Sequence, residues 1–209
     1  MDGAPIDTGS SVIGVLALQG AFAAHAERLR QLGASTRLIK TPEHLAGVSA
    51  LVMPGGESTT MSKLLVSSGL FDPIAERIAD GMPVFGTCAG MILLATEVLD
   101  GRPDQRSFAA IDIGVRRNGY GRQVDSFETD LEIRLTADGP PGEAPFHGVF
   151  IRAPRVVRVG PDVTVLAELD GDPVLVRQGH VTVASFHPEL ALDLRLHAQF
   201  LESAHQRSK

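Results

Sequence analysis

The chain has 209 residues, 44% hydrophobic and 21% charged, which are the proportions of a folded globular protein rather than a disordered or fibrous one. Its 19 Lys and Arg against 25 Asp and Glu give a net charge of −6, so we expect no nucleic-acid partner. The polar, acidic amino terminus is unlike a secretory signal, and no apolar run reaches the roughly 18 residues that a membrane span needs. We therefore expect a cytoplasmic protein without membrane association.

The first half of the chain alternates apolar runs with helical patterns. Residues 1–11 lack periodicity and are expected to form a flexible tail, and residues 12–209 a single domain. Strands are predicted at 12–18, 36–39, 50–53 and 82–85, and helices at 21–32, 41–43 (a helix start), 58–68, 73–79 and 91–99, with Ser58 or Thr59 capping the third. Strands buried on both faces and separated by helices predict an α/β fold, a doubly wound, mostly parallel sheet flanked by helices.

The second half has shorter, alternating runs. Antiparallel strands and hairpins are predicted at 111–115, 131–135, 149–151, 163–169, 174–176 and 181–186, and a helix at 192–205. Residues 137–145 have the composition of a linker, but we interpret them as a loop within one domain, because the segment after them completes the candidate site described next.

A glycine-flanked cysteine lies between a predicted strand and a predicted helix. Gly86-Thr87-Cys88-Ala89-Gly90 has the form of a nucleophile elbow, in which a sharp turn exposes the nucleophile and small residues allow the two backbones to approach. Cys88 is the one cysteine of the chain, which excludes an internal disulfide and a Cys-rich zinc site. The alternative is a buried structural cysteine.

One of the seven histidines has a neighbour suited to acid–base catalysis. His187 ends a predicted strand and precedes Pro188-Glu189, so in extended geometry His187 and Glu189 face the same side and the carboxylate can orient the imidazole. The alternative is a strand-end histidine followed by a helix-capping Pro-Glu. The other six are interpreted as core or solvated residues, on helices (His25, His44, His197, His205) or in turns (His147, His180).

An attacked carbonyl also needs hydrogen-bond donors for its oxyanion. The backbone N–H of Ala89 supplies one, and the Gly55-Gly56 loop at the end of a neighbouring strand is placed to supply the second, although a plain strand-to-helix turn would also explain that loop. All of these candidates follow strands, at the edge where open α/β sheets bind ligands.

Together these motifs resemble those of class I (triad-type) glutamine amidotransferases, which have a flavodoxin-like fold. More narrowly, the chain is similar to the glutaminase subunits of pyridoxal 5′-phosphate synthase from about residue 13 to residue 200. The matching blocks are LALQGAF (16–22), PGGESTTM (54–61), FGTCAGMILLA (85–95), RNGYGRQVDSF (117–127), GVFIRAP (148–154) and SFHPE (185–189). GxCxG and HPE occur in many amidotransferases, whereas the other four blocks indicate this branch.

The resemblance implies a Cys-His-Glu triad of Cys88, His187 and Glu189 that hydrolyses L-glutamine to L-glutamate and ammonia. The family's substrate-binding positions match Gln19, Gly56, Glu57, Ser58, Arg117, Ile151 and Arg152. Both arginines suit the substrate's α-carboxylate, although surface ion pairs are the ordinary alternative, and their individual contacts stay open.

The resemblance also implies a partner, the (β/α)₈-barrel synthase subunit that receives the ammonia and builds pyridoxal 5′-phosphate. We expect no cofactor and no metal in this chain. Because free hydrolysis would waste glutamine, we hypothesise that docking of the synthase completes the oxyanion hole by turning a peptide in the Gly55-Gly56 loop.

Three other interpretations are weighed. The chain could be the glutaminase of another pathway, such as imidazole glycerol phosphate synthase, a non-catalytic scaffold subunit, or a stand-alone cysteine hydrolase. The branch-specific blocks disfavour the first, and the presence of both Cys88 and His187 disfavours the second. The third predicts activity without a partner.

Overall fold

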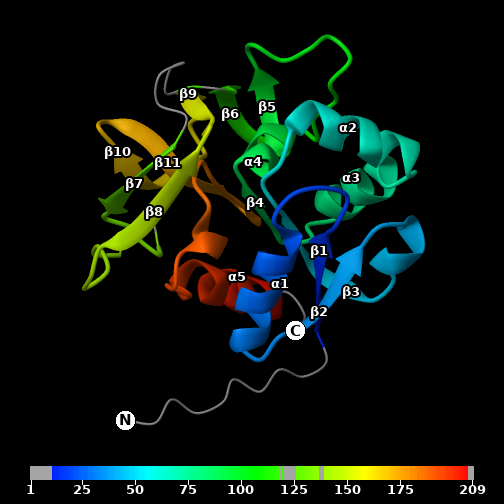
Figure 1. The fold of residues 1–209 in the computed structure, drawn as a ribbon, viewed down its shortest axis with the longest axis horizontal. Helices are drawn as coiled ribbons and strands as arrows, with labels where there is room; N and C mark the ends of the chain where they lie inside the picture. Colours follow the sequence, from blue (N-terminus) through cyan, green and yellow to red (C-terminus); the bar gives the residue numbers. More distant parts are fainter. Residues whose placement is uncertain (1–10, 118, 120–125, 137–138, 207–209) are drawn as a thin grey trace.

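The computed structural model describes residues 11–117, 119, 126–136 and 139–206. Residues 1–10 of the expected tail, most of the 117–127 motif and part of the 137–145 loop lie outside the described residues. Figure 1 shows a central sheet with helices on both faces and a group of shorter strands at one end.

The central sheet has seven strands in the order β10-β11-β12-β4-β3-β1-β2. Five run parallel: β1 (Val12–Leu16), β2 (Ser35–Ile39), β3 (Val48–Met53), β4 (Val84–Thr87) and β12 (Val181–Ala184). The other two, β10 (Thr164–Leu169) and β11 (Asp172–Gln178), pair antiparallel at one edge. The predicted mostly parallel sheet with antiparallel strands from the second half is confirmed.

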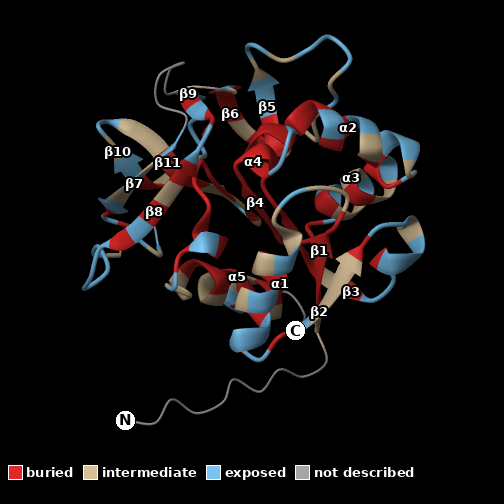
Figure 2. Cartoon of the chain, viewed as in Figure 1, coloured by how far each residue is buried: buried red, intermediate tan, exposed pale blue. Residues whose placement is uncertain are grey.

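Helices cover both faces of this sheet, because the strand residues that point to either face are apolar. One face packs on α2 (Ser58–Ser67), α3 (Phe71–Ala79) and α4 (Ala89–Leu94), and the other on α1 (Phe22–Gln31) and α5 (Arg195–Gln206). In β3, Leu51 and Met53 belong to the first core, and Ala50 and Val52 to the second. Figure 2 shows the resulting buried centre and the exposed outer faces of the helices.

Two smaller sheets come from the middle of the chain. A three-stranded sheet contains β5 (Ala95–Val98), β6 (Ile111–Arg116) and β9 (Arg155–Val159), and a hairpin contains β7 (Ser126–Leu131) and β8 (Phe146–Ile151). Two 3₁₀ turns, η1 (Pro42–Leu45) and η2 (Pro188–Leu190), complete the described elements. Among the described residues, no helix combines the length and the apolar character that crossing a bilayer requires.

Several predicted boundaries are wrong for reasons of pairing. The helix expected over 91–99 ends at Leu94, and residues 95–98 form β5 because they pair with β6. The strand expected at 131–135 lies at 126–131, where it pairs with β8. Strand β9, which pairs with β6, was not predicted. In each case a partner distant in the sequence overrides local propensity.

Candidate active site

A pocket of about 320 Å³ opens at the carboxyl ends of the parallel strands. It contains nine of the predicted residues, from segments far apart in the sequence: Gly55, Gly56, Glu57, Ser58, Cys88, Arg117, Ile151, Arg152 and His187. Gly20, Ala21 and Ile92 complete its lining. The other three predicted residues, Gln19, Ala89 and Glu189, lie beside or behind the pocket.

Cys88 occupies the sharp turn that the sequence predicts between β4 and α4. Its backbone has φ 50° and ψ −104°, a strained conformation for a residue with a side chain. The flanking glycines allow the turn: a Cβ on Gly90 would lie 2.1 Å from the Met53 carbonyl oxygen, and one on Gly86 2.9 Å from the Gly90 carbonyl carbon. The thiol Sγ is 3.8 Å from the Ile151 carbonyl oxygen. Ala89, which follows, is buried as the first residue of α4.

His187 and Glu189 form a buried pair beside the cysteine. His187 Nδ1 lies 2.8 Å from Glu189 Oε1, which confirms that the two side chains meet. The predicted extended geometry is wrong, because Pro188 begins the turn η2 and brings the carboxylate round by a 3₁₀ bend. His187 Nε2 is buried and has no hydrogen-bond partner among the described residues. This ring nitrogen is therefore free to act on a reacting group.

The charges of this pair support one another. Burial by itself lowers the pKa of His187, but the interactions with Cys88 and Glu189 outweigh it and raise that pKa to about 10. Burial likewise favours a protonated Glu189, yet contacts with His187 and His25 hold its pKa well below the ordinary range. The pair is an imidazolium beside a carboxylate.

The Gly55-Gly56 loop packs tightly against His187 and Cys88. A Cβ on Gly55 would lie 2.5 Å from His187 Cε1 and 3.3 Å from Cys88 Cβ, so the loop backbone reaches both side chains. Its far side is fixed by Gly20, at φ +90°, where a Cβ would lie 1.6 Å from the Gly55 carbonyl oxygen. Gln19 Oε1 accepts a hydrogen bond from Glu57 N at 3.1 Å. Gln19 thus holds the loop from outside the pocket.

Glu57, rather than Ser58 or Thr59, caps α2. Its carboxylate accepts from Thr59 N at 3.1 Å and from both Thr60 N and Thr60 Oγ1 at 2.7 Å. Burial opposes the ionised form, but these hydrogen bonds prevail and lower the pKa of Glu57 to about 2. A capping carboxylate was not predicted because Ser and Thr are the commoner caps.

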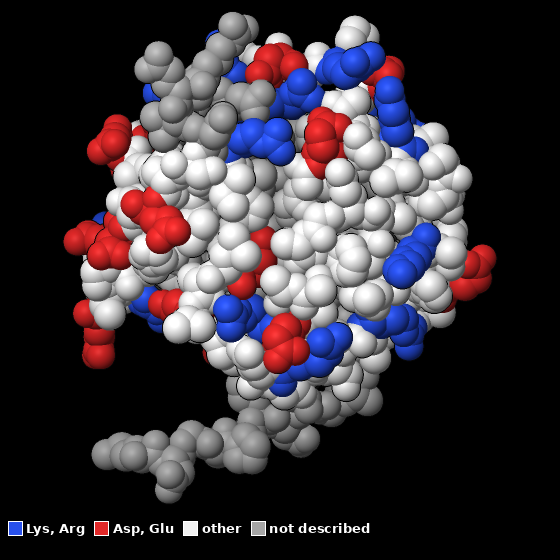
Figure 3. All heavy atoms as spheres, in the orientation of Figure 1, with Lys and Arg blue, Asp and Glu red and all other residues white. Residues whose placement is uncertain are grey.

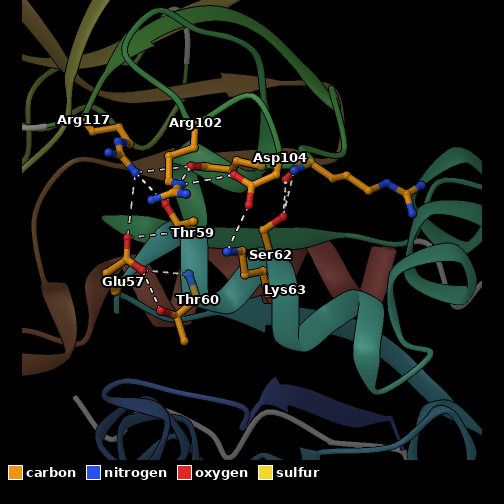
Figure 4. Close-up of polar contacts among 10 residues, drawn as sticks. Glu57, Thr59, Thr60, Ser62, Lys63, Arg102, Asp104 and Arg117 are labelled. Carbon is orange, nitrogen blue, oxygen red and sulfur yellow. Dashed lines mark hydrogen bonds and ion pairs between the residues drawn. The ribbon is translucent and has the colours of Figure 1, made fainter.

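Arg117 is tied to the same helix start. Its Nη1 donates to Thr59 Oγ1 at 2.7 Å and to Gln105 Oε1 at 3.3 Å, and it lies 3.8 Å from Glu57 Oε1. Figure 4 shows the guanidinium directed toward Glu57 and Thr59, beside a more distant pair of Lys63 with Asp104. Arg152 adopts φ 43° next to Ile151 and also lines the pocket.

Comparisons with known proteins agree on one family. Residues 15–206 match the SNO glutamine amidotransferase family. A curated relative from Corynebacterium jeikeium, "Pyridoxal 5'-phosphate synthase subunit PdxT", is 53% identical over 197 residues, which cover 94% of this chain and 98% of the relative. The protein of the same name from Salinispora arenicola is 54% identical over 196 residues, 91% of this chain and 95% of that one.

The chain belongs to the SNO glutamine amidotransferase family.

A solved structure entitled "Crystal structure of glutamine amidotransferase" supports the same assignment for the fold. It is 50% identical to this chain with a TM-score of 0.85, over 93% of this chain and all of that one. The chain is accordingly a class I glutamine amidotransferase, with the predicted enzyme class and fold.

Sequence reasoning missed one polar residue at this amidotransferase site. His25, interpreted from the sequence as a core or solvated residue, is fully buried with Nε2 3.2 Å from Glu189 Oε2. The signal was its spacing, because His25 lies three residues after Phe22 and four before Leu29, on the apolar side of the predicted helix. A histidine in that stripe needs a buried polar partner, which the sequence does not identify.

Proposed function

We propose that this chain is the glutaminase subunit of pyridoxal 5′-phosphate synthase and hydrolyses L-glutamine to L-glutamate and ammonia. The single observation that carries the proposal is that Cys88 and His187, whose Nε2 has no partner among the described residues, line one pocket, with the buried Glu189 behind His187. Curated relatives of that name, at about half identity over most of the chain, support the assignment to this pathway.

Chemistry proceeds in two steps. The Cys88 thiolate attacks the side-chain amide carbon, and the oxyanion is stabilised by N–H groups of Ala89 and of the Gly55-Gly56 loop. His187 Nε2–H protonates the nitrogen as the C–N bond breaks, which releases ammonia and leaves a γ-glutamyl thioester. His187 then takes a proton from water, whose oxygen attacks the thioester and releases glutamate and the thiolate. Glu189 keeps Nδ1 protonated and holds the ring in place.

The remaining predicted residues bind glutamine. Gly56, Glu57, Ser58, Arg117, Ile151 and Arg152 line the pocket, and Gln19 supports it. Glu57 suits the substrate's α-ammonium and the two arginines its α-carboxylate. Because Arg117 already donates to Thr59 and Gln105, Arg152 has more freedom to meet the substrate.

The ammonia passes to the barrel subunit of the synthase, which is the proposed partner. Docking of that subunit changes the conformation of the Gly55-Gly56 loop. In the structure, the Gly55 carbonyl oxygen lies where a side chain on Gly20 would be. Cytoplasmic location is part of this proposal, because the mechanism needs Cys88 as a reduced thiol.

Glutamate release from glutamine tests this function. We expect release by the wild-type chain only when a pyridoxal 5′-phosphate synthase barrel subunit is added, and none from Cys88→Ala under either condition. Equal release without the partner would contradict gating and indicate a stand-alone hydrolase. No release with the partner would favour a scaffold or the glutaminase of a different synthase. Wild-type turnover by Cys88→Ala would overturn the nucleophile.

A further inference from the structure

A chain of buried polar side chains continues behind the site. His25 on α1, His197 on α5, Thr87 at the end of β4 and Glu189 on η2 are each at most 1% exposed. Burying four polar groups together is costly unless their hydrogen bonds are satisfied. None of the four lines the pocket, so substrate contact does not explain their burial.

His25 links the other members. Its Nε2 is in hydrogen-bond geometry with Thr87 Oγ1 at 3.1 Å, and its Nδ1 with His197 Nε2 at 3.0 Å. The same Nε2 makes an electrostatic contact with Glu189 Oε2 at 3.2 Å, an oxygen without a hydrogen-bond partner among the described residues. The other carboxylate oxygen, Oε1, meets His187 Nδ1. Each oxygen of Glu189 therefore faces a different imidazole.

The two ends of the chain fix the positions of its protons. His197 Nδ1 is buried without a hydrogen-bond partner among the described residues, and a bare ring nitrogen is less costly there than an orphaned N–H. The His197 proton is then on Nε2 and is donated to His25 Nδ1, which places the His25 proton on Nε2. At the other end, the opposite tautomer of His25 would set a lone pair 3.2 Å from a buried carboxylate oxygen.

We propose that His25 is a positioning residue of the active site, and that His197 fixes its tautomer so that the Nε2–H is held against Thr87 and Glu189 Oε2. This role rests on the proposed function, since its effect on catalysis passes through Glu189 to His187. His25 thereby links Thr87, the residue before Cys88, to Glu189, the carboxylate that orients His187. Losing its N–H would remove the dipole that faces Oε2 at 3.2 Å and let the carboxylate rotate away from His187.

The electrostatic surroundings agree with a neutral His197. Burial first, and then the neighbouring His25, lower the pKa of His197 to about 3, with Arg28 acting in the same direction and Glu189 against it. Arg28 also donates from Nε to the Glu189 carbonyl oxygen at 3.1 Å, which ties α1 to η2. A neutral His197 is the donor that the tautomer argument requires.

Paired substitutions at His25 separate positioning from packing. His25→Leu removes the donor, whereas His25→Gln retains an N–H near the position of Nε2. With the synthase present, we expect His25→Leu to lower kcat about 10-fold or more, with KM changed less than about 2-fold. His25→Gln should recover most of the loss. His205→Leu, the same replacement on α5, where Nδ1 contacts only the Leu201 carbonyl in the described contacts, is the matched control.

The tautomers are measured independently in the wild-type protein. Long-range ¹H–¹⁵N correlation of labelled imidazoles distinguishes a protonated ring nitrogen from a bare one. We expect Nε2 protonated and Nδ1 bare in both His25 and His197 at neutral pH. An Nδ1–H tautomer of His25, or a doubly protonated His25 ring, would overturn the proposal even if every variant failed to fold.

The outcomes separate this inference from the proposed function. A wild-type complex without Cys88-dependent glutamate release means that the proposed function fails. An active wild type whose His25→Leu variant matches His205→Leu means that positioning by His25 fails. Equal loss in His25→Leu and His25→Gln would assign His25 to packing and would likewise overturn the proposal.

Discussion

At the scale of single residues, Glu189 is defined by having an imidazole beside each of its oxygens. Its Oε1 accepts from His187 Nδ1 at 2.8 Å, and its Oε2 makes an electrostatic contact with His25 Nε2 at 3.2 Å, so a negative oxygen faces each ring. An amide in its place has one acceptor and one donor, and it can satisfy only one of the two histidines. The proposed roles of His187 and Glu189 can therefore be separated by substitution.

We predict that Glu189→Gln lowers kcat less than His187→Asn does. The first loses orientation, at a cost of about 10²- to 10⁴-fold, and the second loses the proton carrier, at a cost of about 10⁵-fold or more. Steady-state glutamate release in the presence of the synthase measures both. Glutamine KM should change less than kcat in either variant, because neither side chain is assigned to bind the substrate's α-ammonium or α-carboxylate. A greater loss in Glu189→Gln than in His187→Asn would contradict these roles.

The sequence predicted Cys88, His187 and Glu189 because Cys88 and His187 each come after a predicted strand and Glu189 follows His187 by two residues. It could not predict the pairing of His25 with His197, which are 172 residues apart. In the sequence, each histidine lies only within the apolar stripe of a predicted helix. Their contact depends on α1 and α5 packing on the same face of the sheet. Tertiary packing decides such a contact, and periodicity carries no information about it.

At the scale of elements, the start of α2 serves both stability and the site. The carboxylate of Glu57 caps the helix, and Arg117 reaches Thr59 in the first turn, so the loop that lines the pocket and the helix behind it are held together. By contrast, residues 95–98 resemble a helix in composition but form β5. The local sequence pattern did not predict the Glu57 cap, because glutamate is an unusual capping residue. It did not predict β5 either, because that strand forms only by pairing with β6.

We predict that Glu57→Ala lowers the free energy of unfolding by about 1 kcal/mol, the usual cost of losing an amino-terminal cap. Urea denaturation measures this loss, and glutamine KM should rise in the same variant if the residue also binds substrate. Glu76→Ala, an exposed change on α3, is the control and should leave both quantities close to wild type. Equal stability of the two variants would show that the cap is not stabilising.

At the scale of the whole molecule, the architecture was predictable because it depends on pattern alone. Apolar runs alternating with amphipathic helices require a sheet covered on both faces, as Figure 1 shows. Charges of both signs are interspersed over the face in Figure 3, and the absence of a nucleic-acid partner stays a prediction from net charge. The free energy of unfolding of the whole molecule should also depend on the ionisation of Glu189, which is buried beside the site.

We predict that acid destabilises the wild type more than Glu189→Gln. Burial opposes ionisation of Glu189, but His187 and His25 prevail and depress its native pKa below the unfolded value of about 4.3. Below about pH 4.3 the unfolded chain therefore binds more protons at this group, and the stability that it contributes is lost as pH falls toward the native pKa.

Urea denaturation of both proteins between about pH 6 and about pH 3, a range that brackets the unfolded pKa, measures this effect. The two free energies of unfolding should converge as the pH falls. Glu202→Gln on α5, an exposed glutamate, is the control and should run parallel to wild type throughout this range. A constant difference between wild type and Glu189→Gln would show that the native carboxylate has an ordinary pKa.

The order of strands in the central sheet also has a consequence for synthesis on the ribosome. Strand β12 follows the other six strands of this sheet in the chain but inserts between β4 and β11, and its Ala184 pairs with Thr87 next to the nucleophile. Until residue 184 has left the exit tunnel, β4 lacks the neighbour on that side, and Cys88 has no base because His187, three residues further along the chain, has not yet emerged. A nascent chain thus carries a thiol without its base beside an open strand edge, and the thiol gains its base only after residues 181–189 have emerged.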